Sequence, residues 1–96
     1  MKKLLKGTRQ VITEDNHYLN LEYYLVETNY VEQGTSNTAY GIEIMKEFNG
    51  EVETDIVQKI TSHKDEAMQI MDKLIANTVT PMSMVIAIDE LCSLKI

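Results

Sequence analysis

The chain has 96 residues, of which 44% are hydrophobic and 25% charged, and this composition is typical of one small globular domain. The net charge of -6 disfavours nucleic acid, whose phosphates require clustered Lys and Arg, and it disfavours anionic membrane surfaces. A single cysteine, Cys92, excludes an internal disulfide. No apolar run is long enough for a signal peptide or a membrane span. We therefore expect a cytoplasmic single domain over residues 1–96, with a loosely held lead-in over residues 1–7.

Residues 8–14 alternate weakly and predict a first strand. Asp15 and Asn16 tolerate a left-handed backbone, and a two-residue turn at these positions places Ile12 opposite Leu19. Residues 18–28 then show the longest alternation in the chain and predict a central strand. One face of this strand carries the apolar residues Leu19, Leu21, Tyr23 and Leu25, and the other carries Asn20, Glu22, Tyr24 and Val26.

The next two strands are predicted on either side of Asn49-Gly50, the strongest turn signal in the chain. Residues 30–37 have the polar composition of a loop, and alternation resumes at Thr38. Both strands carry their apolar residues at even positions, namely Tyr40, Ile42, Ile44 and Phe48 in one and Val52, Ile56 and Ile60 in the other.

The even positions of the apolar residues in both strands decide the predicted turn type. A two-residue loop pairs Phe48 with Glu51 and sets the buried residues of one strand opposite the exposed residues of the other. A type I turn with Gly50 as a left-handed bulge residue avoids this conflict. The bulged hairpin, which we therefore predict, places Glu43 opposite Asp55.

Helical periodicity begins at Ser62 and ends near Asn77, and Thr80-Pro81 predicts the start of a second helix. The predicted apolar stripe of the second helix is Val85, Ile88, Leu91 and Cys92. The predicted fold class is α+β, a four-stranded antiparallel β-meander followed by two C-terminal α-helices packed on one face of the sheet. The predicted core consists of Leu21, Tyr23, Ile42, Ile44, Ile56, Ile70, Leu74 and Ile88.

Three short motifs carry a resemblance to a known family. They are Tyr23-Tyr24-Leu25-Val26, Tyr40-Gly41-Ile42-Glu43-Ile44 and Thr80-Pro81, in this order along the chain. In these motifs the chain resembles a family of small uncharacterised proteins, a domain of unknown function, from clostridia and related Gram-positive bacteria. The resemblance implies no activity and no catalytic residue.

The uncovered face of the predicted sheet is the candidate interaction face. Its residues are Tyr18, Glu22, Tyr24, Val26, Glu43 and Asp55. Tyrosine and valine among carboxylates are typical of a docking patch, although ordinary cross-strand packing and a solvated acidic surface have the same composition. If Glu22 lies opposite Glu43, three carboxylates form a row that suits Ca²⁺ or Mg²⁺. Gly41 within its strand indicates either cover by Tyr24 or the close approach of another backbone.

The remaining reactive residues lack a catalytic pattern. His17 and His63 have no ligand or base at a known spacing, and Cys92 lies on an apolar stripe. We assign no catalytic, cofactor-binding or metal-binding residue. The prediction is a non-enzymatic protein-interaction or regulatory module that uses the exposed sheet face or self-association. The alternative is a small-ligand or divalent-cation-binding domain that uses Glu22, Glu43 and Asp55.

Overall fold

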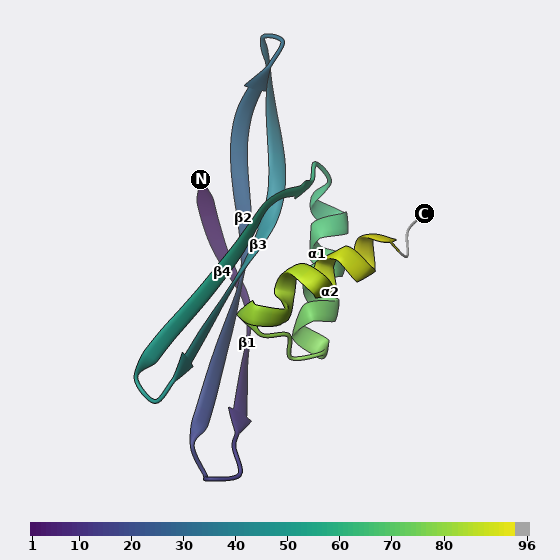
Figure 1. Cartoon of the computed structure of the whole chain (residues 1–96). Coiled ribbons are helices and arrows are strands. Elements are labelled where there is room, and N and C mark those ends of the chain that lie inside the picture. The colour runs from purple at the N-terminus through teal and green to yellow at the C-terminus, as the bar shows by residue number, and fades with distance from the viewer. Residues whose placement is uncertain (94–96) are drawn as a thin grey trace.

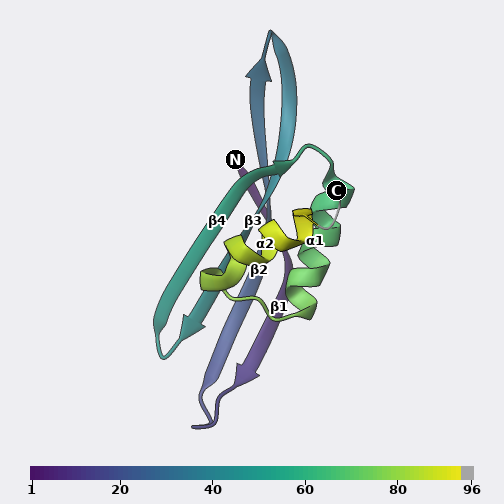
Figure 2. The same cartoon turned by 45° about the vertical axis from the view of Figure 1, so that its right-hand side comes forward.

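The computed structural model describes residues 1–93 and places four antiparallel strands side by side in the order of the sequence. Two helical segments follow the sheet, and they lie together on one of its faces (Figures 1 and 2). This architecture confirms the predicted meander with two C-terminal helices. The elements are β1 (Lys2–Ile12), β2 (Tyr18–Glu32), β3 (Thr35–Phe48), β4 (Glu51–Thr61), α1 (Lys64–Ala76), the 3-10 turn η1 (Pro81–Ser83) and α2 (Met84–Ser93).

Strand β1 begins at Lys2, so residues 2–7 belong to the sheet, with an irregularity at Lys6, instead of forming a separate lead-in. The turn that follows differs by one residue from the predicted two-residue turn. The Thr13 N–H donates to the His17 carbonyl at 2.8 Å, and Asn16 has a φ of 62°. This three-residue loop pairs Ile12 with Tyr18, which turns Ile12 away from the leucine face.

The predicted loop over residues 30–37 is instead the end of a long hairpin. A two-residue turn at Gln33-Gly34, with φ of 51° and 78°, joins β2 to β3, and pairing continues to Glu32 and Thr35. Pairing with β1 reaches only Glu27, and pairing with β4 reaches only Tyr40. Residues 28–39, which we call the arm, therefore project as a two-stranded ribbon beyond the rest of the sheet (Figure 1).

The predicted bulged turn between β3 and β4 is wrong. Asn49 and Gly50, with φ of 52° and 79°, form a two-residue turn of the type I′ kind, and Phe48 pairs with Glu51. The irregularity lies further along β4, where three residues between Val57 and Thr61 face the single residue Gly41 and Lys59 adopts a φ of 55°. This bulge lets Val57 and Ile60 both pack against the core.

Gly41 lies opposite this bulge, and the close backbone approach is the reason for a glycine here. A Cβ at Gly41 would lie 2.2 Å from the Val57 carbonyl oxygen. Of the two explanations that the sequence offered, the structure therefore supports the approaching backbone and not cover by Tyr24.

The first helix starts two residues later than predicted, with His63 at its N-cap, and Thr61 holds the segment that leads into it. The Thr61 hydroxyl accepts the His63 N–H at 3.1 Å and donates to Glu66 Oε2 at 2.8 Å. The helix ends at Asn77, as predicted, and the Val79 N–H reaches back to the Leu74 carbonyl at 3.0 Å. Pro81 then begins η1, which continues directly into α2.

The core lies between the helices and one face of the sheet. Every predicted core residue except Ile56 belongs to this cluster; Ile56 faces the other way because of the changed β3–β4 register. The Tyr23 hydroxyl donates to the Val79 carbonyl at 2.8 Å and ties the sheet to the segment between the helices. Burial raises the pKa of Tyr23 to about 12, against a smaller lowering by Arg9.

Candidate interaction face

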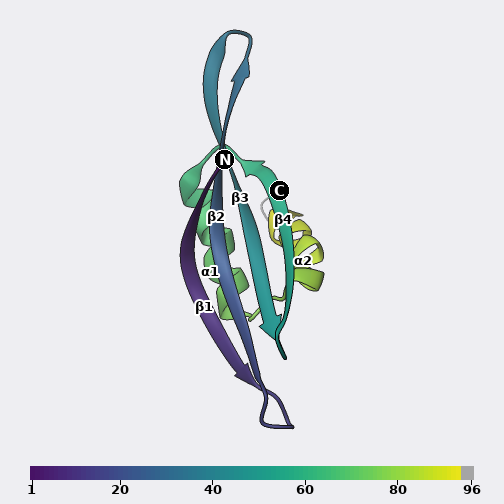
Figure 3. The same cartoon turned by 90° about the vertical axis from the view of Figure 1, so that its left-hand side faces the viewer.

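The side of the sheet opposite the helices is the candidate site, and we call it the open face. Figure 3 shows its strands in front, with both helices behind them. The register brings the even-numbered residues of β2 together with odd-numbered residues of β3 and even-numbered residues of β4. Within residues 1–93, the helices cover only the other face.

Several large apolar side chains of the open face are exposed. Tyr18 and Val52 are 54% and 62% exposed, and Leu5 and Ile12 of β1 are exposed to a similar degree. The register places Ile12 beside Tyr18, and Leu5 beside Tyr24. Exposed apolar side chains therefore lie on β1, β2 and β4, and not only at Tyr18, Tyr24 and Val26, which the sequence indicates.

The upper part of the open face, around Lys3, Val26 and Glu43, is packed, and the charge of Glu43 is neutralised within the chain. Lys3 on β1 crosses over β2 to reach Glu43 on β3, with a distance of 2.8 Å between Lys3 Nζ and Glu43 Oε1. Its ammonium also lies 5.5 Å from the centre of the Tyr24 ring. Val26, opposite Lys3 in the register, is completely buried there. The lysine stem thus covers the valine while its charge neutralises Glu43.

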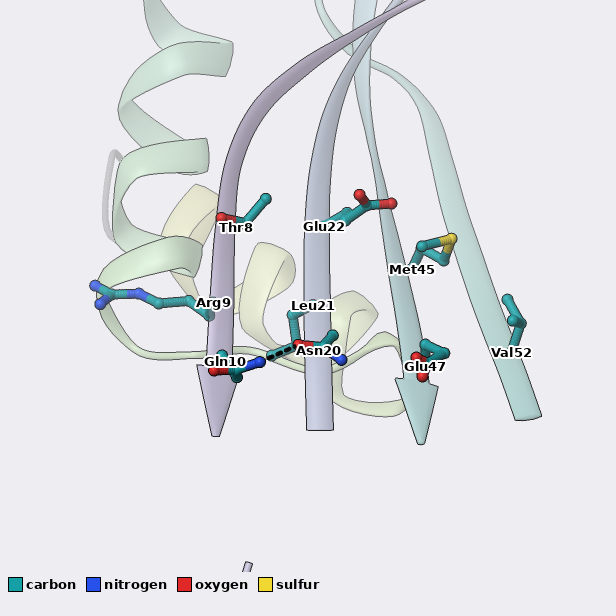
Figure 4. Close-up of a pocket in the computed structure, with 9 residues that line it drawn as sticks. All are labelled: Thr8, Arg9, Gln10, Asn20, Leu21, Glu22, Met45, Glu47 and Val52. Atoms are coloured by element: carbon teal, nitrogen blue, oxygen red, sulfur yellow. Dashed lines mark hydrogen bonds between the residues drawn. The ribbon is translucent and has the colours of Figure 1, made fainter. Parts of the chain in front are cut away.

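A depression of about 510 Å³ occupies the lower part of the open face (Figure 4). Glu22 and Glu47 are half-buried at its wall, and Gln10 donates a side-chain hydrogen bond of 2.9 Å to Asn20. The residues that line it are Thr8, Arg9, Gln10, Asn20, Leu21, Glu22, Met45, Glu47 and Val52.

The Tyr24 hydroxyl fixes one wall of this depression. It donates to Glu22 Oε1 at 2.8 Å. This hydrogen bond to Glu22, followed by burial and the negative charges of Glu22 and Glu43, raises the pKa of Tyr24. Tyrosine therefore stays a neutral donor, and Glu22 is oriented as a hydrogen-bonded anion.

The structure brings together five of the six predicted site residues and separates the sixth. Tyr18, Glu22, Tyr24, Val26 and Glu43 lie on the open face, although Val26 is buried and offers no contact surface. Asp55 lies opposite Ile44, on the other side of the sheet, and its carboxylate accepts its neighbour's N–H, that of Ile56, at 2.9 Å.

The row of three carboxylates proposed for a cation does not form. Glu22 lies opposite Met45, and Glu43 lies opposite Ile56. Within residues 1–93, no group of three or more His, Cys, Asp or Glu side chains is placed to hold a metal ion. The observed registers therefore remove the geometric basis of the cation-binding alternative.

Sequence reasoning missed Glu47, Met45 and Val52 as residues of this site. Glu47 and Met45 occupy odd positions of β3, which were assigned to the uncovered face but not connected to Glu22. The predicted bulged turn places Val52 on the buried face, whereas the observed two-residue turn places it opposite Glu47 on the open face. The Asn49-Gly50 pair, which strongly favours a two-residue turn, is the sequence signal that indicates the observed register of β3 and β4.

A second exposed apolar surface lies on the helical side. Met82 and Ile86 are 82% and 65% exposed, and Val85, predicted to be buried, is also exposed. Met84 is buried instead, and Ile88 is buried as predicted. Among the described helices, none has the length and apolar character needed to cross a bilayer.

Comparison with known families adds one finding. A family model of unknown function, DUF6514, matches residues 2–94. The chain belongs to the DUF6514 family. The match includes all four strands and both helical segments, so the open face and the arm are parts of the DUF6514 domain. No curated protein and no solved structure matches the chain.

Proposed function

We propose that this DUF6514 protein is a non-enzymatic protein-interaction module of the cytoplasm that binds a partner through its open face. The observation that carries the proposal is the uncovered face itself, on which Leu5, Ile12, Tyr18 and Val52 expose apolar surface next to half-buried carboxylates. Extended apolar surface rimmed by polar groups is typical of protein interfaces.

The rigidity of the open face supports a binding role. Lys3 is held between Glu43 and the Tyr24 ring, and Tyr24 in turn holds Glu22. Side chains that are already fixed lose little conformational entropy when a partner binds. These three side chains therefore need little reordering when a partner docks beside them.

The surroundings of the two reactive side chains, His17 and Cys92, support a non-enzymatic role. His17 packs against the Phe48 ring with 6.2 Å between ring centres, and Cys92 is half-buried against the core cluster. These contacts give both side chains a packing role. The proposal assigns neither of them a role in chemistry.

Site-specific photo-crosslinking in cells tests this function. A photoreactive amino acid at Val52 probes the open face, and the same amino acid at Ile86 is the matched control, because both positions are exposed to a similar degree on opposite sides of the molecule. We expect a crosslinked protein adduct from position 52 and none from position 86. A Tyr18→Ser change should remove the adduct at position 52.

Two results of this experiment would contradict the proposed function. Adducts that form only at position 86 would assign binding to the exposed stripe of η1 and α2. The absence of any adduct at position 52 would show that the open face contacts no protein in the cell.

A further inference from the structure

We propose that the partner of the open face is a basic protein segment, and that an arginine or lysine of this segment enters the depression between Glu22 and Glu47. This inference rests on the proposed function, because it specifies the partner of the same surface. Two observations support it: the carboxylates of the depression form no ion pair among residues 1–93, and apolar side chains lie beside them in the lining.

The depression carries two carboxylates whose charges are not neutralised locally. Glu47 lies opposite Asn20, and Glu22 is the next residue of β2 on the same face, so the two glutamates are diagonal neighbours across the strands. Neither forms an ion pair among residues 1–93. Two half-buried anions this close favour a cation between them.

The single basic residue in the lining is turned away from these carboxylates. Arg9 Nε donates to the Ile75 carbonyl at 3.0 Å, at the end of α1. Figure 4 shows its side chain leaving the depression toward the helical layer. Glu43, by contrast, has its own cation in Lys3 on the upper part of the same face. Among residues 1–93, no basic side chain therefore pairs with these two carboxylates, and we infer that a partner supplies the positive charge.

The lining suits the whole length of a basic side chain. Met45 and Val52 offer apolar surface to its aliphatic stem, and the two glutamates receive its charged end. Arginine donates several hydrogen bonds in a fixed plane and pairs well with carboxylates. The Gln10 and Asn20 amides are hydrogen-bonded to each other and complete a polar floor.

The same charges disfavour a second copy of this chain as the occupant. Two open faces packed against each other would bring two pairs of Glu22 and Glu47 together, and each copy carries a net charge of -6. Like charges that face each other across an interface oppose association. Charge complementarity therefore selects a basic partner.

The test is a titration of the ¹⁵N-labelled protein with a synthetic peptide that carries isolated arginines, each flanked by leucine or valine. A second peptide with glutamate in place of each arginine is the control ligand. We expect saturable shifts for the arginine peptide at the amides that surround Asn20, Glu22 and Glu47, and none for the glutamate peptide. The double variant E22Q/E47Q should weaken binding about tenfold or more at low salt, and added salt should reduce this difference.

The double variant D72N/E90Q is the matched control. It removes the same two charges from exposed positions on the helices and should bind the arginine peptide like the parent protein. The inference is overturned if the arginine peptide gives no saturable shifts, if the glutamate peptide binds as well, or if E22Q/E47Q binds as tightly as D72N/E90Q. If crosslinking at position 52 succeeds while any of these results holds, the proposed function survives and the basic partner does not.

Discussion

Gly41 of β3 leaves room for the bulge of β4. The Val57 carbonyl approaches so closely that any Cβ at position 41 would overlap it, and the obstacle is backbone, which cannot rotate away. Gly7 of β1 is the useful contrast, since a Cβ there would meet only the end of the Ile75 side chain, at 2.7 Å. The obstacle to a larger residue is therefore backbone at Gly41 and the end of a side chain at Gly7.

We predict that Gly41→Ala lowers the free energy of unfolding by at least about 2 kcal/mol, because β4 must move or its bulge must rearrange. Gly7→Ala should cost less, since Ile75 can change rotamer. Urea denaturation of both variants measures the difference. Equal stabilities of the two variants would contradict the close approach at Gly41.

Tyr23 gives the fold a sensitivity to alkaline pH. Its pKa rises from 10.0 to about 12 on folding, so the folded state holds the hydroxyl proton more tightly than the unfolded state does. The stabilisation is complete below pH 10 and is lost as the pH rises toward 12, by on the order of 2–3 kcal/mol.

Tyr23→Phe should remove this part of the alkaline loss. The variant also leaves the Val79 carbonyl without its donor, which should cost about 1–2 kcal/mol at neutral pH. Denaturation curves of parent and variant between pH 8 and about pH 12 provide the measurement. A parent and a variant that lose stability in parallel above pH 10 would contradict this role for Tyr23.

At the scale of the elements, the arm is the part with the least support. Residues 28–39 are paired only with each other, whereas the rest of β2 and β3 is flanked by β1, β4 and the helices. Thr28 Oγ1 is buried at the base of the arm with no hydrogen-bond partner. The Lys59 ammonium lies 5.0 Å from the centre of the Tyr30 ring, and this contact connects β4 to the base of the arm.

A two-stranded ribbon of this kind is marginally stable by itself. We predict that hydrogen-bonded amides of residues 28–39 exchange with solvent at least about tenfold faster than those of residues 19–26. Native-state hydrogen exchange followed by NMR measures both sets within the same two strands. Equal protection along the whole of β2 would contradict an unsupported arm.

The elements also show where sequence reasoning succeeded and where it failed. The period-2 pattern of β2 and the 3.6 pattern of α1 each identify a buried face, because one continuous side of each element meets the core. In β4 the same reasoning failed, since the two-residue turn at Asn49-Gly50 places Val52 and Ile56 on the open face, and only the bulge near Lys59 returns Ile60 to the core. The apolar character of Val52 and Ile56 reflects the open face and not the core.

The candidate site was less predictable than the fold, because it depends on two registers at once. Glu22 and Glu47 become neighbours only when the Gln33-Gly34 turn fixes β2 against β3. Val52 joins them only when the Asn49-Gly50 turn fixes β4. An error of one residue in a turn moves every side chain of a strand to the other face. Such an error leaves the predicted fold class unchanged, but it changes which residues are predicted to share a face of the sheet.

At the scale of the whole molecule, the sheet is covered on one side only. The helices bury the leucine face of β2, and the other side presents apolar and acidic side chains to solvent (Figure 3). An uncovered face of this kind is tolerated by antiparallel sheets. We propose that Glu22 and Glu47, which form no ion pair among the described residues, disfavour contact between copies of the chain and favour a positively charged partner.

Solution mass, measured by light scattering over about a hundredfold range of protein concentration, tests this central claim most directly. A single-chain mass of 11.0 kDa throughout is the predicted result, because the open face stays vacant until a basic partner covers it. A dimer that becomes a monomer on the double change Y18S/V52S would contradict the claim, since the occupant of the open face would then be a second copy of the chain.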